Sequence, residues 1–178
     1  MSFAVAKGQL PSFQIDEYEI MNICRYTWAP GRDPFVSPED LFTAPPDALF
    51  PLIDTYLKLQ GFYLLQGMAS SGWEEADATV ATGVLALTMT HSLAYDVPRL
   101  SREAAYARAA AFVGEFSPLA RFLLSSDVYD LSLEPDGFPP ASWRGMLCGR
   151  GLTNWTFGVG QIAVDFEKIG VYWIQDED

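Results

Sequence analysis

The sequence predicts an α+β fold, in which a central, bundle-like layer of helices packs on a small antiparallel sheet from the C-terminal third. Helical apolar spacing and capping signals recur between residues 37 and 124. After Asp127, glycine and proline become frequent, and two short runs of strand-forming residues follow. The length of 178 residues fits one domain, residues 1–178, because such a chain buries roughly 70% of its unfolded surface.

Residues 12–28 are compatible with either a strand or a helix. Phe13 and Ile15 alternate as in a strand, whereas Ile20 and Ile23 have helical spacing. Both interpretations stay open, so the sheet gains at most one N-terminal strand here. A loop follows, because the prolines and the glycine after this segment continue neither kind of element.

Two helices are predicted next. Ser37 is a suitable N-cap for a short helix at about 38–43, since proline takes the first helical position and two acids follow it. Asp47 is then expected to cap a longer helix. The apolar residues of this second helix form a wide stripe: Leu49, Leu52, Ile53, Tyr56, Leu57, Leu64, Leu65 and Met68.

The following helix is expected to open at Trp73-Glu74-Glu75 and to contain the longest uncharged run, from Ala78 to Tyr95. These 18 residues are long enough to be tested as a membrane span. Their threonine, serine and histidine content and their acidic flanks argue against insertion into lipid. The run therefore predicts the most buried helix of the domain, and no membrane contact is expected.

Serine N-caps predict two further helices. Ser101 starts one of them, and Ser117, followed by proline, starts another that continues through Leu124. The first presents one face made of Tyr106, Ala109, Ala110 and Val113.

The C-terminal run predicts two short paired strands. Ile162, Val164 and Phe166 share one face of the first strand, a charged break at Glu167-Lys168 ends it, and an apolar run through Ile174 forms the second. Because the apolar phase changes near residue 160, a β-bulge is expected there if Trp155, Phe157 and Val159 belong to the same strand.

Charge limits the choice of partner. Acidic residues outnumber lysine and arginine by 23 to 11, giving a formal charge of −12 and a pI near 4.3. Such a chain repels a phosphate backbone, so no direct nucleic-acid partner is expected. The same field attracts a basic protein or keeps the domain soluble. The N-terminal residues lack a signal-peptide pattern, and Cys24 and Cys148 are expected to be free, which points to a cytoplasmic location.

The sequence contains few residues that are typical of a catalytic site or a metal site. His91 is the one histidine and lies in an apolar helical run, which favours a core or interface role. Cys148 has no surrounding nucleophile signature. The spacings typical of zinc and calcium sites are absent from the sequence, so no metal and no cofactor are expected.

The leading hypothesis is a non-catalytic, acidic domain that binds another protein, most specifically a small bacterial immunity or inhibitor protein that neutralises a partner toxin. It rests on elimination and on composition, and it leaves a homo-oligomer open. The candidate partner-binding residues combine tryptophans beside predicted turns with nearby acids: Trp73, Glu74, Glu75 and Asp77, and Asp16, Glu17, Glu19 and Trp28.

Two alternatives remain. The first is a small enzyme or ligand-binding domain with a pocket near the glycine-rich residues 145–160, formed by Arg144, Cys148, Arg150 and His91. The glycine-rich stretch has neither a GK[ST] nor a GxGxxG motif, and a strand rather than a helix follows it, so the phosphate-loop interpretation is weak. The second alternative is a structural subunit of a larger assembly.

Overall fold

The structure, a computed structural model, describes residues 22–28, 36–59, 72–93, 97–125, 131–143 and 157–176. This part of the chain contains five strands and four helices. In chain order they are β1 (Asn22–Trp28), α1 (Pro38–Thr43), α2 (Pro46–Leu59), β2 (Glu74–Ala76), α3 (Ala78–Thr90), α4 (Arg102–Val113), β3 (Arg121–Leu124), β4 (Phe157–Val164) and β5 (Ile169–Asp176).

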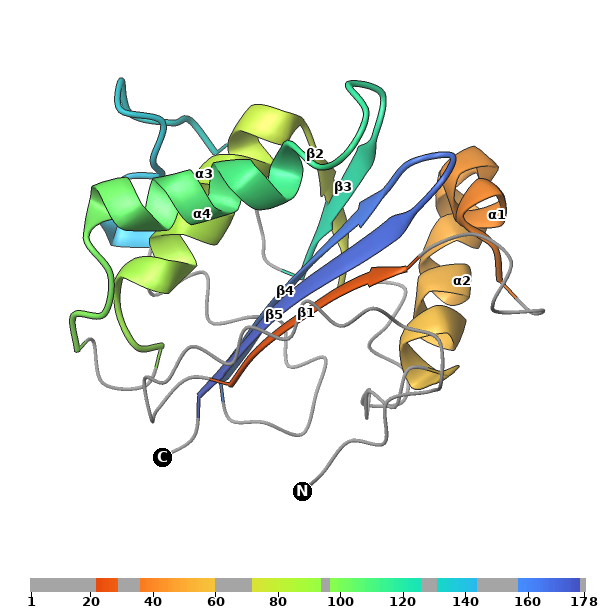
Figure 1. Cartoon of the computed structure of the whole chain (residues 1–178), viewed down its shortest axis with the longest axis horizontal. Helices are drawn as coiled ribbons and strands as arrows, with labels where there is room; N and C mark the ends of the chain where they lie inside the picture. Colours follow the sequence, from red (N-terminus) through yellow and green to blue (C-terminus); the bar gives the residue numbers. More distant parts are fainter. Residues whose placement is uncertain are drawn as a thin grey trace.

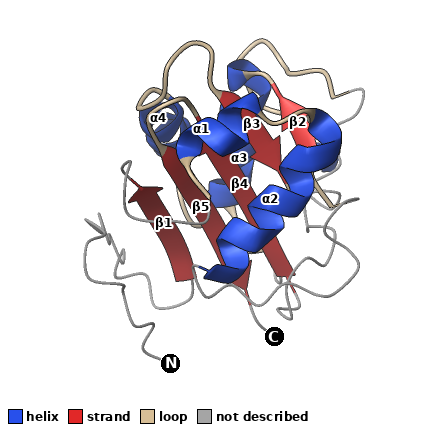
Figure 2. Cartoon of the chain, turned by 90° about the vertical axis from the view of Figure 1, so that its right-hand side faces the viewer, coloured by secondary structure: helices blue, strands red, loops and turns tan. Residues whose placement is uncertain are grey.

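The strands form one antiparallel sheet in the order β1-β5-β4-β3-β2, with the C-terminal hairpin of β4 and β5 in its interior. The α+β class is therefore confirmed, and the open N-terminal segment supplies an edge strand. Figures 1 and 2 show the sheet between two helical pairs, α1 with α2 on one face and α3 with α4 on the other. The expected helical layer is thus divided between the two faces of the sheet.

Each face of the sheet has its own apolar core. On β4, Ile162 and Val164 belong to the core beneath α1 and α2, whereas Ala163 belongs to the core beneath α3 and α4. On β5, Trp173 and Tyr172 divide in the same way. Successive side chains of a strand point to opposite faces, so a sheet covered on both sides needs apolar residues at nearly every position.

The predicted hairpin of β4 and β5 is confirmed, whereas the bulge expected near residue 160 does not occur in the described pairing; Trp155, on which that expectation partly depended, lies outside the described residues. Cα pairing runs without interruption from Phe157 opposite Asp176 to Val164 opposite Ile169. A Cβ on Gly160 would overlap the indole of Trp173, so this glycine makes room for a bulky cross-strand neighbour. The change of apolar phase reflects burial on both faces, not an extra residue.

Helix α1 has the predicted boundaries and a complete capping box. Ser37 Oγ accepts from the Asp40 amide at 3.1 Å, and Asp40 Oδ2 accepts from the Ser37 amide at 2.9 Å. Asp47 is not the N-cap of α2, because Pro45 O accepts from the Leu49 amide at 2.9 Å and Asp47 lies in the first turn. The distal part of the predicted apolar stripe lies outside the described residues: Leu64, Leu65 and Met68.

Two segments predicted as helix are strands. Trp73-Glu74-Glu75 leads into β2, and the segment after Ser117-Pro118 becomes β3. The side chains from Phe122 to Leu124 are buried, and they alternate between the two cores, which a strand between two helical layers does and a helix of one turn does not. Sheet pairing therefore overrides the local helix-start signals.

Helix α3 is the expected buried helix. It begins after Asp77, whose side chain accepts from the Thr79 and Val80 amides, and the residues from Ala81 to Thr90 are all buried. None of the helices in the described part of the chain has both the length and the apolar character that a bilayer span requires.

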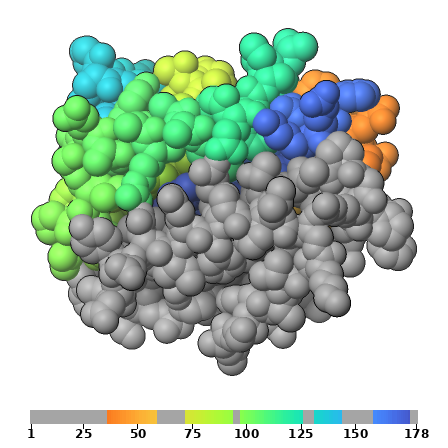
Figure 3. Space-filling model, in the orientation of Figure 1, coloured from red at the N-terminus to blue at the C-terminus, as the bar shows by residue number. Residues whose placement is uncertain are grey.

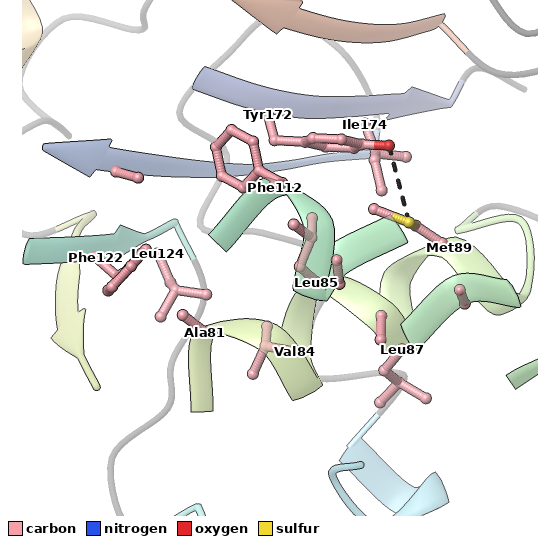
Figure 4. Packing of buried hydrophobic residues seen from close by; sticks show 14 of the residues in the cluster. Ala81, Val84, Leu85, Leu87, Met89, Phe112, Phe122, Leu124, Tyr172 and Ile174 are labelled. Carbon is pink, nitrogen blue, oxygen red and sulfur yellow. Dashed lines mark hydrogen bonds between the residues drawn. The ribbon is translucent and has the colours of Figure 1, made fainter. Parts of the chain in front are cut away.

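Helix α4 starts after Ser101 as predicted and covers α3. Ala105, Ala109 and Phe112 are its buried residues, so the inward face is displaced from the predicted one. Figure 4 shows Phe112 and Tyr172 above α3, with the Tyr172 hydroxyl directed at Met89 Sδ at 3.8 Å.

Residues 131–143 lie against α3 and α4. Arg102, the first residue of α4, pairs with Asp136 and lies 3.9 Å from the centre of the Phe138 ring. Gly137 has a φ of +80°, a conformation that favours glycine, and its carbonyl oxygen occupies the space that a Cβ on Gly83 would need. Two glycines therefore allow this connection to lie close on the helices.

Candidate functional site

Trp73 is not the surface anchor that the sequence analysis predicted. It is buried, with 3% of its surface exposed, and its ring meets the Trp173 ring edge to face at a centroid distance of 6.0 Å. It belongs to the core beneath α1 and α2. The side chain faces inward because it directly precedes the edge strand β2, where neighbouring positions alternate between faces.

Two of the acids beside Trp73, Glu75 and Asp77, make hydrogen bonds within the chain. Glu75 makes two hydrogen bonds of 2.8 Å to the guanidinium of Arg121. Arg121 Nη1 also donates to the Ala44 carbonyl at 2.6 Å, just after α1, where carbonyls have no partner within the helix. Asp77 caps α3, and Glu74 is half-buried. Glu75 and Asp77 therefore make contacts within the fold.

The second predicted acidic cluster lies outside the described residues, since Asp16, Glu17 and Glu19 precede β1. Trp28 is the last residue of β1, whose backbone places it at one edge of the sheet. This cluster stays a prediction.

Of the residues proposed for the alternative pocket, only His91 belongs to the described part of the chain. It is the C-cap of α3, it is half-buried, and its Nδ1 lies 3.0 Å from Thr90 Oγ1. Arg144, Cys148 and Arg150 lie outside the described residues. Within the described ranges, no three or more His, Cys, Asp and Glu side chains are grouped in a way that could hold a metal ion.

A buried carboxylate that the sequence analysis missed lies on α2. Asp54 is 7% exposed, and burial raises its pKa, opposed by the Lys58 ammonium at 4.0 Å and by the Trp73 N–H. Asp54 Oδ1 and Trp73 Nε1 nevertheless lack a hydrogen bond of ordinary geometry. The signal in the sequence was an aspartate between Ile53 and Tyr56 in an apolar stripe. The raised pKa means that this group holds a proton near the core more readily than an exposed aspartate does.

An exposed apolar surface lies at one end of the sheet, and we call it the hairpin-end surface: Phe42, Leu119 and Phe166. Leu119 is 79% exposed and Phe166 is 54% exposed. The Phe166 ring packs edge to face on Phe42 of α1, with centroids 6.1 Å apart. Figure 3 shows the blue hairpin tip between the green connection that precedes β3 and the orange α1.

Asp165 joins the two turns that carry this surface. This 5% exposed carboxylate accepts from the Glu167 and Lys168 amides at 3.0 and 2.9 Å, which fixes the β4–β5 turn. Its other oxygen accepts from the Ser117 amide at 3.1 Å, which fixes the turn that carries Leu119. The apolar side chains are therefore presented by a hydrogen-bonded framework.

Both exposed residues lie outside the elements that their sequence context predicts. Phe166 was expected in the first C-terminal strand, on the same face as Ile162 and Val164, but β4 ends at Val164 and Phe166 lies in the turn. Leu119 was expected in a helix, but it lies in the turn before β3. Both residues lie in turns rather than in the predicted helix and strand, and their side chains are exposed.

Comparison with known proteins finds no match: no family model, no curated protein and no solved structure resembles this chain at a significant level. Functional inference therefore rests on the chemistry of the chain itself.

Proposed function

We propose that this chain is an acidic protein-binding domain whose partner is a basic protein. The observation that supports the proposal is the excess of acidic over basic residues, 23 to 11. In addition, four cations of the described structure contact groups of their own chain: Lys58, Arg102, Arg121 and Lys168. An excess of carboxylates is thereby left for solvent or for a partner.

The contacts of these four cations are as follows. Arg102 lies between Asp136 and Glu134, and Arg121 binds Glu75 together with carbonyls after α1. Lys58 lies beside Asp54, and the Lys168 ammonium lies 5.1 Å from the centre of the Phe116 ring. Each of these cations faces an acceptor, a carboxylate or a ring of its own chain, so it offers little attraction to an anionic partner.

The finer form of the proposal is an immunity or inhibitor protein that neutralises a basic toxin. A charge of −12 on a chain of this size increases the association rate with a cationic enzyme, as an inhibitor that must act quickly requires. This form rests on charge and composition.

The test is to capture partners on the immobilised full chain and to measure association of the purified partner at two salt concentrations. We expect a stoichiometric basic protein whose association rate falls about tenfold or more between about 50 mM and about 500 mM salt. A neutral partner, or an association rate that does not depend on salt, would contradict the proposal. Growth rescue on co-expression with the partner tests the toxin-inhibitor form.

A further inference from the structure

We infer that the hairpin-end surface is the place where the basic partner docks, with Phe166 and Leu119 as its apolar anchors. This inference rests on the proposed function and adds the surface and the kind of partner face that fits it. That face carries an apolar residue surrounded by lysine or arginine.

Exposure is the first argument. Single exposed apolar residues are ordinary on protein surfaces. In the described structure, however, the large hydrophobic residues with high exposure are Val97, Leu119 and Phe166, and two of these three occur on adjoining turns. Phe42 extends the patch, since its ring packs on Phe166. The apolar area is therefore concentrated at one end of the sheet.

Rigidity is the second argument. Asp165 fixes both turns through three backbone amides, and Arg121 ties β3 to the end of α1. An anchor that is already held in place loses little conformational freedom when a partner binds. An aromatic residue in such a position is the kind that dominates binding energy at protein interfaces.

The charge around the hairpin-end surface favours a basic partner. Glu39 and Asp40 are exposed on α1, and Glu167 is exposed next to Phe166. Glu39 lies three residues before Phe42, which puts the two on the same side of the helix. The exposed carboxylates beside the patch are therefore those of Glu39 and Glu167, while the nearby cations are engaged within the chain, Arg121 with Glu75 and Lys168 over the Phe116 ring. A basic protein is attracted to this surface, whereas a second copy of the chain or a nucleic acid is repelled.

The test uses two synthetic peptides of equal charge, one of ten lysines and one in which leucine and tryptophan are interspersed among ten lysines. Each is titrated at low salt into the isotope-labelled full chain, and amide chemical shifts are followed. For the mixed peptide, we expect the largest changes at residues 117–120 and 165–168, with tighter binding than for the lysine peptide.

Variants then separate the surface from the charge. Phe166→Ala and Leu119→Ala should each weaken binding of the mixed peptide about tenfold, whereas Val97→Ala, a matched change at an exposed site outside this surface, should leave it unchanged. Glu39→Lys with Glu167→Lys should slow association about tenfold, and Glu103→Lys on α4 should have a smaller effect.

The outcomes are distinguishable. Absence of binding for both peptides at low salt would overturn the proposed function and this inference together. Binding that maps elsewhere, or that is unchanged in Phe166→Ala, would overturn the surface alone. A concentration-dependent dimer that Phe166→Ala dissolves would identify a second copy as the occupant and would also overturn the inference.

Discussion

Asp54 is a residue whose ionisation opposes folding. Burial raises its pKa, so the folded chain holds the proton more tightly than the unfolded chain does. The loss of folding stability caused by ionised Asp54 is therefore complete above the raised pKa of the folded chain. This loss decreases as the pH falls from the pKa of the folded chain toward the pKa of the unfolded chain, about 3.9.

Asp54→Asn should accordingly raise the melting temperature at neutral pH. The gain should shrink as the pH falls to about 4, where Asp54 of the parent chain becomes protonated. Thermal unfolding of both proteins across this pH range is the measurement, with Asp47→Asn, an exposed residue of the same helix, as the control. A lower melting temperature for Asp54→Asn at pH 7 would mean that the attraction to Lys58 exceeds the cost of burial.

Gly160 has no side chain, and this leaves the space that the Trp173 indole occupies on the neighbouring strand. A Cβ at this position would overlap the Trp173 indole, which is completely buried. We predict that Gly160→Ala lowers the free energy of unfolding by about 1–3 kcal/mol, because overpacking forces nearby side chains from their preferred rotamers. Urea denaturation measures this loss. In a Trp173→Leu background, the same change should cost less, and equal losses in both backgrounds would show that the indole is not the cause.

At the scale of elements, Arg121 connects three parts of the fold. It lies on β3, binds Glu75 of β2, and donates to a carbonyl that follows α1. Arg121→Met should cost about 1–3 kcal/mol, because a carbonyl loses its donor. Glu75→Gln should cost less than about 1 kcal/mol, because the Glu75 side chain is 42% exposed. Chemical denaturation of both variants tests the order, and equal losses would argue against the carbonyl contact.

Helix α1 depends strongly on its cap, since it has only six residues and short helices gain little from propagation. Ser37→Ala removes the acceptor for the Asp40 amide and should cost about 1 kcal/mol. Hydrogen exchange should accelerate in residues 38–43 and remain unchanged in α3. Uniform acceleration across both helices would mean that α1 opens only with the whole domain.

For the whole molecule, the net charge of −12 predicts that salt stabilises the fold at neutral pH. Screening weakens the repulsion among excess carboxylates more than it weakens the few internal ion pairs. The melting temperature should therefore rise between about 20 mM and about 200 mM salt at pH 7. Near the pI of about 4.3 the rise should disappear, and a fall at pH 7 would show that the ion pairs dominate.

Local signals in the sequence predicted the elements whose ends are fixed by local contacts. The Ser37 and Ser101 caps and the charged turn before β5 all lie where the pattern placed them, because each depends on residues within one helical turn or hairpin. The α+β class followed from the same local patterns. The predictions for Trp73, as a surface residue, and for Phe166, as a strand residue, were wrong. The amino-acid type of a residue does not show where a neighbouring strand begins or ends.

Sequence by itself thus determined the class, the capped helices, the C-terminal hairpin and the acidic charge. Tertiary structure decided that the segments of β2 and β3 pair in a sheet and that helices cover both faces of this sheet. It also decided that Glu75 forms an ion pair with Arg121. It further packed Phe166 on Phe42 of α1 and joined the β4–β5 turn to the turn that carries Leu119. The physical reason is that caps and turns involve neighbouring residues, whereas sheet pairing and burial depend on contacts between residues far apart in the chain.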